Sequence, residues 1–122
     1  DQIGSPTWAG TLAETIVKLI PFCKFNRISD FVKYEGVYNV ADLGSVSRLE
    51  WAKAILQNDP SRKRQIYEII QPSLSSEFST LARRPLFSAL NCEKIQKTFN
   101  ISLQNWEIRL SLAMKEPVIT LS

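Results

Sequence analysis

Only two short stretches of this chain have the composition of β-strands, and this scarcity limits the available folds more than any other feature. One stretch is residues 37–41, and the other is residues 65–71, which contains three isoleucines and a tyrosine and ends before Pro72. β-Branched and aromatic residues favour extended backbone at such positions. Two strands make a poor sheet on their own. The sequence therefore predicts a helix-rich α/β unit with few strands.

Two helices are predicted in the first half of the chain. In residues 7–20 the apolar residues recur at helical spacing, and Pro21 then ends the pattern. Further along, Ser47 is followed three residues later by Glu50, the spacing of a capping box. This pair predicts a second helix that ends near Asn58.

Two more helices are predicted in the last third of the chain. Asn91 is a suitable cap for a helix that runs to about Phe99. A final amphipathic helix follows Ser102 and ends before Pro117. Trp51 and Trp106 lie on apolar helix faces, which predicts packing roles for both. A short helix is expected at residues 29–33, and a single helical turn is expected at residues 76–79.

Composition excludes several classes of function and places the chain in an ordinary class. At 122 residues it has the length of one domain, and it has no histidine, which excludes His-dependent hydrolases and His-ligated zinc. Cys23 and Cys92 cannot form a zinc cluster alone, and we expect reduced thiols in a cytoplasmic protein. The net charge of +3 is spread out, with its densest cluster at residues 62–64, so we expect no nucleic-acid partner. No apolar run approaches the roughly 20 residues of a membrane helix, so we expect no membrane contact.

Several sequence blocks follow one another in an order typical of one protein family. They read D-Q-I-G-S-P-T at residues 1–7, G-V-Y-N-V at 36–40, S-R-L-E-W-A-K-A-I at 47–55, R-P-L-F-S-A-L-N at 84–91 and W-E-x-x-L at 106–110. Together, over about residues 1–116, they resemble dTDP-4-dehydrorhamnose reductases, which are extended short-chain dehydrogenase/reductases. That family combines an N-terminal Rossmann domain for NADPH with a smaller C-terminal domain for the nucleotide sugar.

Two features of that family are missing from this sequence. The chain has four glycines and no G-x-x-G-x-x-G fingerprint for the cofactor. None of its three tyrosines is followed four residues later by the lysine of the catalytic Tyr-x-x-x-Lys pair. The resemblance implies that residues 1–122 are a single C-terminal substrate-binding fragment without the main Rossmann sheet. It also implies that NADPH and the catalytic residues belong to an N-terminal domain of the parent protein, with no metal site here.

The resemblance further implies which residues meet the nucleotide sugar. Arg84 of the R-P block is the first candidate, because a guanidinium group aligns two donors with a diphosphate, and Arg83 is the second. Gln2 and Thr7 belong to the first block, which lies near the sugar-nucleotide cleft of the family. Trp8 directly follows that block and either stacks on thymine or packs in the core. The structural alternatives are that Arg84 braces the adjacent turn and that the first block only begins a helix.

Two classes of function are compatible with the sequence. In the first, the parent protein reduces dTDP-4-dehydrorhamnose with NADPH, and this chain forms walls of the substrate site but is inactive alone. In the second, the chain is a non-catalytic module, like the regulatory subunit of methionine adenosyltransferase, or part of another sugar-nucleotide epimerase or dehydratase. The D-Q-x-G-S-P-T block favours the reductase. We also expect self-association, because residues 8–20 and 37–41 would expose apolar surface without the Rossmann domain.

Overall fold

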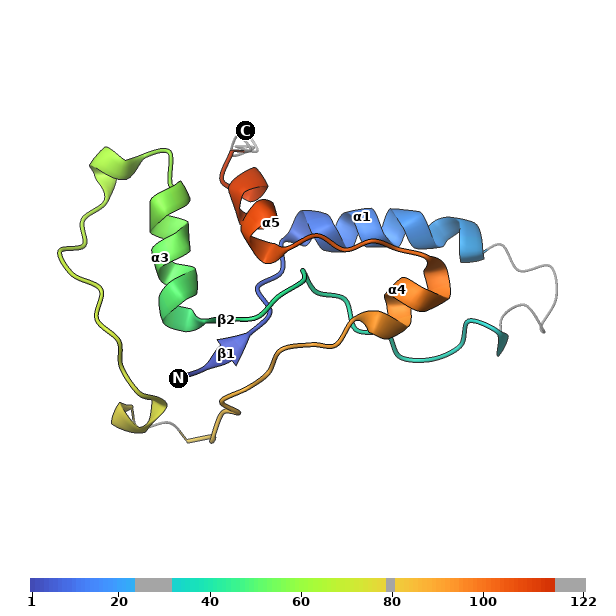
Figure 1. Ribbon diagram of the computed structural model, residues 1–122, viewed down its shortest axis with the longest axis horizontal. Helices are drawn as coiled ribbons and strands as arrows, with labels where there is room; N and C mark the ends of the chain where they lie inside the picture. The colour runs from blue at the N-terminus through green and yellow to red at the C-terminus, as the bar shows by residue number, and fades with distance from the viewer. Residues whose placement is uncertain (24–31, 79–80, 116–122) are drawn as a thin grey trace.

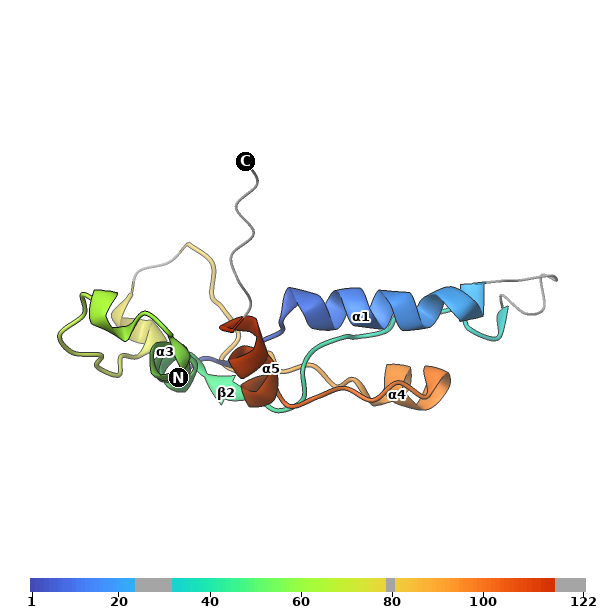
Figure 2. The same cartoon turned by 90° about the horizontal axis from the view of Figure 1, so that it is seen from above.

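The fold is an elongated, helix-rich arrangement with very little sheet. The computed structural model describes residues 1–23, 32–78 and 81–115. Within these residues, α3 lies at one end, α1 and α4 lie side by side at the other end, and α5 lies between them (Figures 1 and 2). The elements are β1 (Ile3–Gly4), α1 (Ala9–Leu19), β2 (Val46–Ser47), α3 (Arg48–Asn58), α4 (Glu93–Phe99) and α5 (Trp106–Ala113), with short 3-10 turns at Ile20–Cys23, Arg62–Arg64 and Ser75–Glu77.

Both helices predicted in the first half of the chain are confirmed. Helix α1 ends at Leu19 and gives way to a 3-10 turn that contains Pro21, as expected for a residue that cannot donate the next helical hydrogen bond. At the start of α3, the Ser47 hydroxyl accepts a hydrogen bond from the Glu50 amide at 3.1 Å. The Glu50 carboxylate binds Lys53 at 2.9 Å. The capping signal in the sequence therefore located this helix correctly.

Side-chain amides also define the ends of the two later helices, which are confirmed as well. The Asn91 side chain accepts a hydrogen bond from the Glu93 amide, and the Asn105 side chain accepts one from the Glu107 amide, each at 2.8 Å. Helix α4 ends at Asn100, whose φ of 51° is left-handed. Asparagine adopts this conformation more readily than most residues do. The caps thus explain where α4 and α5 begin and where α4 ends.

The two predicted strands are wrong. Residues 37–41 and 65–71 have irregular backbone, and Ile66 is 98% exposed. Strand propensity reflects how well a side chain fits a pleated surface, and it supplies no neighbouring strand. The strands that do form, β1 and β2, are only two residues long. The predicted turn at residues 76–79 corresponds to the 3-10 turn at Ser75–Glu77. Of the predicted segment at residues 29–33, residues 29–31 fall outside the described residues.

Three distant parts of the chain meet at β1. It pairs antiparallel with β2, with Ile3 opposite Ser47 and Gly4 opposite Val46. On its other side, the Ile3 amide donates to the Leu86 carbonyl at 2.8 Å, and the Ser88 amide donates to the Ile3 carbonyl at 2.9 Å. The first sequence block, the start of α3 and the R-P block are therefore joined by backbone hydrogen bonds.

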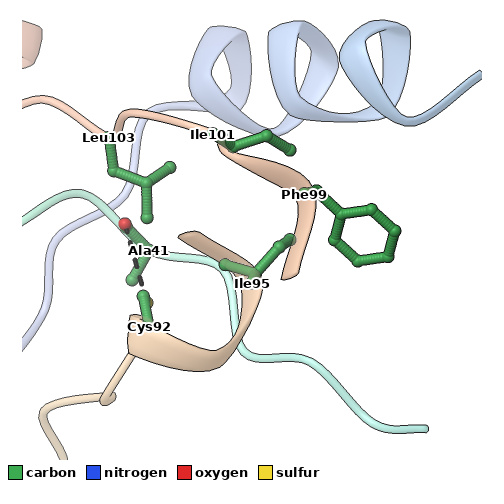
Figure 3. Packing of buried hydrophobic residues seen from close by; sticks show 6 residues of the cluster. All are labelled: Ala41, Cys92, Ile95, Phe99, Ile101 and Leu103. Carbon is green, nitrogen blue, oxygen red and sulfur yellow. Dashed lines mark hydrogen bonds between the residues drawn. The ribbon is translucent and has the colours of Figure 1, made fainter. Parts of the chain in front are cut away.

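The hydrophobic core lies around α4 (Figure 3). Its buried members are Ala41, Cys92, Ile95, Phe99, Ile101 and Leu103. The Phe99 ring lies 5.1–5.4 Å from the rings of Phe22, Tyr34 and Tyr38, measured between centroids. Cys92 is a free, buried thiol. This core holds the segment near Ala41 against α4 and the strand-like stretch that leads into α5.

Helix α1 buries its polar face and exposes its apolar one. Thr11 and Thr15 are 1% and 3% exposed, and the Thr15 hydroxyl donates to the Thr11 carbonyl at 2.8 Å. Apolar residues of the helix remain open, with Ile16 at 61% and Val17 at 63% exposed. Within the part of the chain that the structure describes, no element covers this apolar face.

Candidate functional site

An open groove lies between the first sequence block and the start of α3. Its volume is about 440 Å³. A groove of this size is within the range of small-molecule sites. Aromatic, hydroxyl and cationic side chains share its walls, and its lining comprises residues 2–7 and Val46, Ser47, Arg48, Trp51, Ser88 and Leu90. The meeting of three chain segments at β1 therefore produces a concave surface of mixed chemistry.

Gln2 and Thr7, both predicted from the first block, lie at the groove. The Gln2 side-chain amide donates to the Ser75 hydroxyl at 2.9 Å, and that hydroxyl donates to the Asp1 carboxylate at 2.6 Å. The Thr7 hydroxyl donates to the Ser5 carbonyl at 3.1 Å and is exposed. Gln2 is thus held by the protein, whereas Thr7 stays accessible to a ligand.

Arg83 and Arg84 are both exposed but do not line the groove. Neither forms a hydrogen bond or ion pair with another residue in the described parts of the chain. Of their block, Ser88 and Leu90 reach the groove wall. The two guanidinium groups are therefore unpaired, and the described residues show no hydrogen bond or ion pair by which Arg84 would brace a turn.

Trp8 lies at the end of the groove loop and is half-buried, with its ring packed against Arg109. The Arg109 guanidinium lies over this ring, 5.7 Å from its centroid. A β-carbon added at Gly10 would come within 2.6 Å of the ring, so only glycine permits this packing. The Trp8 amide donates to the Asp42 carboxylate at 2.9 Å. These contacts favour the packing interpretation of Trp8, which is absent from the groove lining.

Arg109 forms a bidentate ion pair that joins α5 to α1. Its two terminal nitrogens donate to the Glu14 carboxylate at 3.0 and 2.7 Å. These hydrogen bonds and the charge attraction lower the pKa of Glu14 from its ordinary value of 4.5 and raise the pKa of Arg109. Arg109 is buried, and the Glu14 side chain is 45% exposed. The pair fixes the Trp8 end of α1 against α5.

Glu14→Gln is expected to lower the melting temperature at neutral pH and to have no effect in acid. Folding lowers the pKa of Glu14 below 4.5. The ion pair therefore makes its full contribution to the free energy of unfolding above pH 4.5, and this contribution disappears as the pH falls through the folded-state pKa. Exposure of the carboxylate keeps the effect small. Melting curves of the wild type and the variant, measured from about pH 7 to about pH 3, should converge. A difference between the two melting temperatures that stays constant over this range would contradict a stabilising role for the ion pair.

Sequence reasoning missed two groove residues, Arg48 and Trp51. Both belong to the first turn of α3, and Trp51 is 40% exposed at the groove, although its spacing predicted packing. Trp51 is the tryptophan of the S-R-L-E-W-A-K-A-I block at residues 47–55. Membership of this block was the one sequence signal that could have indicated a functional role for Trp51. Asp42, Glu14 and Arg109 gave no signal at all, because their association depends on the tertiary fold.

The groove has the aromatic, hydroxyl and cationic side chains of a binding site. The described residues contain no cluster of three or more acidic, cysteine or histidine side chains able to hold a metal. The sequence has four glycines and no G-x-x-G-x-x-G phosphate-binding fingerprint. In the described ranges, no helix is both long and apolar enough to cross a membrane.

Comparisons with known proteins agree with the resemblance. The RmlD substrate binding domain family matches residues 1–118. dTDP-4-dehydrorhamnose reductases from Aggregatibacter actinomycetemcomitans and Sinorhizobium fredii are 30% and 31% identical over 88% of this chain. The crystal structure of dTDP-4-dehydrorhamnose reductase from Bacillus anthracis in complex with NADP is 28% identical, with a TM-score of 0.66 over 91% of this chain and 34% of that one.

The chain matches only part of the length of these relatives. It spans 35% of the length of each of the two reductases, and the family match covers nearly the whole chain. The helix-rich fold with a two-stranded sheet agrees with the structural match. The chain belongs to the RmlD substrate binding domain family.

Proposed function

We propose that this chain is the nucleotide-sugar-binding part of an NADPH-dependent reductase that converts dTDP-4-dehydrorhamnose to dTDP-rhamnose. The observation that carries the proposal is that the D-Q-I-G-S-P-T block forms one wall of the groove, in a chain matched by a substrate-binding family. In this proposal residues 1–122 are one substrate-binding unit. NADPH and the catalytic residues are supplied by a Rossmann domain elsewhere in the full-length cytoplasmic protein.

The groove offers a partner for each part of a dTDP-sugar. Trp51 presents a flat aromatic surface suited to thymine, since bases stack on such rings. Arg48 in the lining supplies a guanidinium group for the diphosphate, and we propose that Arg84, which belongs to the same block as the lining residue Ser88, supplies a second. Hydroxyl groups of Thr7 and Ser88 are of the kind that bind sugar hydroxyls. Binding and orientation are therefore the tasks that these residues can perform.

The proposal is tested by measuring NADPH oxidation in the presence of dTDP-4-dehydrorhamnose. We expect the full-length protein to consume NADPH only when the sugar nucleotide is present, and the isolated chain to stay at background. Turnover by the isolated chain would contradict the assignment. A full-length protein without turnover that co-purifies with a stable protein partner would favour a regulatory module instead.

The isolated chain is expected to self-associate. Leu12 and Ile16 of α1 and Ile20 of the 3-10 turn that follows it are 41–61% exposed, and adjoining apolar residues of this kind associate with a covering surface. In the full-length protein we propose that the Rossmann domain provides that surface. Sedimentation velocity of residues 1–122 should show a dimer or larger species. A compact monomer of high stability would contradict this expectation.

A further inference from the structure

We infer that Asp42 is a positioning residue for the groove: it fixes the Trp8 end of the loop that carries Ser5, Pro6 and Thr7. This inference rests on the proposed function of the groove as a nucleotide-sugar site. Asp42 itself does not line the groove, so it acts on a ligand only through the loop.

The contacts of Asp42 are those of a helix cap supplied from a distant part of the chain. Asp42 is 3% exposed. One carboxylate oxygen accepts the Trp8 amide at 2.9 Å, and the other accepts the Thr11 hydroxyl at 2.6 Å. Helix α1 has no side-chain cap of its own and no acidic residue in its first turn. Asp42 therefore satisfies a donor at the helix start and places negative charge there, both of which favour the helix.

The other end of the loop is held by the same stretch of chain. Ile3 and Gly4 pair with Ser47 and Val46, which follow Asp42 by only a few residues. The loop from Ser5 to Thr7 thus has an attachment to residues 42–47 at each end, and within the loop the Ser5 hydroxyl also accepts the Leu90 amide at 3.2 Å. One wall of the groove is this loop, and the other is the start of α3, into which β2 continues directly. The distance between the two walls therefore depends on how both ends of the loop are attached to residues 42–47.

The position of Asp42 is itself fixed by the start of α5. The Leu43 amide donates to the Gln104 carbonyl at 2.7 Å, and the Trp106 amide donates to the Leu43 carbonyl at 3.0 Å. Gly44 then turns the chain toward β2 with a φ of +95°, and a β-carbon there would lie 2.9 Å from the Trp106 ring. Asp42 is accordingly held on rigid backbone, as a residue that positions a loop must be.

The test compares Asp42→Ala with Asp42→Asn in the full-length protein, using dTDP as the probe. Asp42→Ala should raise the Kd for dTDP about tenfold, because the Trp8 amide and the Thr11 hydroxyl lose their partner and the loop loses one attachment. Asparagine can still accept the Trp8 amide hydrogen bond, so Asp42→Asn should recover most of the affinity. The KM of the sugar nucleotide should rise with the Kd.

A matched control separates positioning from stability. Ile95→Val removes one methyl group from the core near α4 and should lower the melting temperature without changing the Kd for dTDP. If Asp42→Ala lowers the melting temperature but binds dTDP like the wild type, the inference is wrong. Should Asp42→Ala not fold, Thr11→Val removes one of the two contacts and should raise the Kd in the same direction. An unchanged Kd in that variant would overturn the inference.

A second measurement needs no ligand and keeps the two proposals distinguishable. Amide hydrogen exchange at Thr7 and Trp8 should be faster in ligand-free Asp42→Ala than in the wild type and in Ile95→Val. If the wild type does not bind dTDP, the proposed function fails, and exchange at these amides still decides whether Asp42 fixes the loop. Equal exchange in all three proteins would show that it does not.

Discussion

Arg84→Ala in the full-length protein is expected to weaken dTDP binding about ten- to a hundredfold, the effect of losing a charge-assisted bidentate contact. Arg84 is exposed and forms no ion pair with any other described residue, so its guanidinium is available to a diphosphate. The KM should rise more than kcat falls, because the diphosphate is remote from the reacting carbonyl and is bound alike in the ground and transition states. Titration of dTDP with parallel melting curves measures both effects.

Three further substitutions make the Arg84 experiment specific. Arg84→Lys should recover only part of the affinity, since an ammonium group does not reproduce the planar fork. Arg64→Ala removes the same charge from an exposed site on the 3-10 turn and should leave binding unchanged. A loss confined to Arg83→Ala would assign the diphosphate contact to Arg83. Normal affinity with a lowered melting temperature in Arg84→Ala would leave only a structural role.

Trp51→Ala is expected to raise the Kd for dTDP about five- to a hundredfold, the range found when an aromatic ring that stacks on a base is removed. The side chain is 40% exposed and faces the groove, so a ligand can reach it. Trp51→Phe retains a flat ring and should keep most of the affinity. If Trp51 serves only to pack α3, the alanine variant will melt earlier and bind dTDP normally.

The helices could be predicted from the sequence because their signals are local. Ser47 and Glu50 lie within one turn, and Asn91 caps a helix that starts two residues later. Pro21 likewise marks the end of α1 by its own chemistry. Each of these effects involves residues close together in the chain, so pattern and propensity are sufficient.

The strands and most of the site could not be predicted, because they depend on contacts between distant residues. Residues 65–71 have strand composition but no neighbouring strand, whereas Gly4 has little strand propensity and pairs with Val46. Similarly, the first block suggested Thr7 as a site residue, but nothing local indicated that Arg48 and Trp51 would share its groove. The family resemblance implied the class of ligand, and only the fold revealed that the start of α3 forms the second wall of the groove.

The most direct test of the central claim is to map dTDP on the full-length protein by amide hydrogen exchange. If this chain carries the nucleotide-sugar site, dTDP will slow exchange in segments 2–7, 46–51 and 88–90, which contain the groove lining. The core segment 95–103 should be unaffected and serves as the internal control. Protection by dTDP that falls elsewhere in the protein and leaves these three segments unchanged would contradict the assignment.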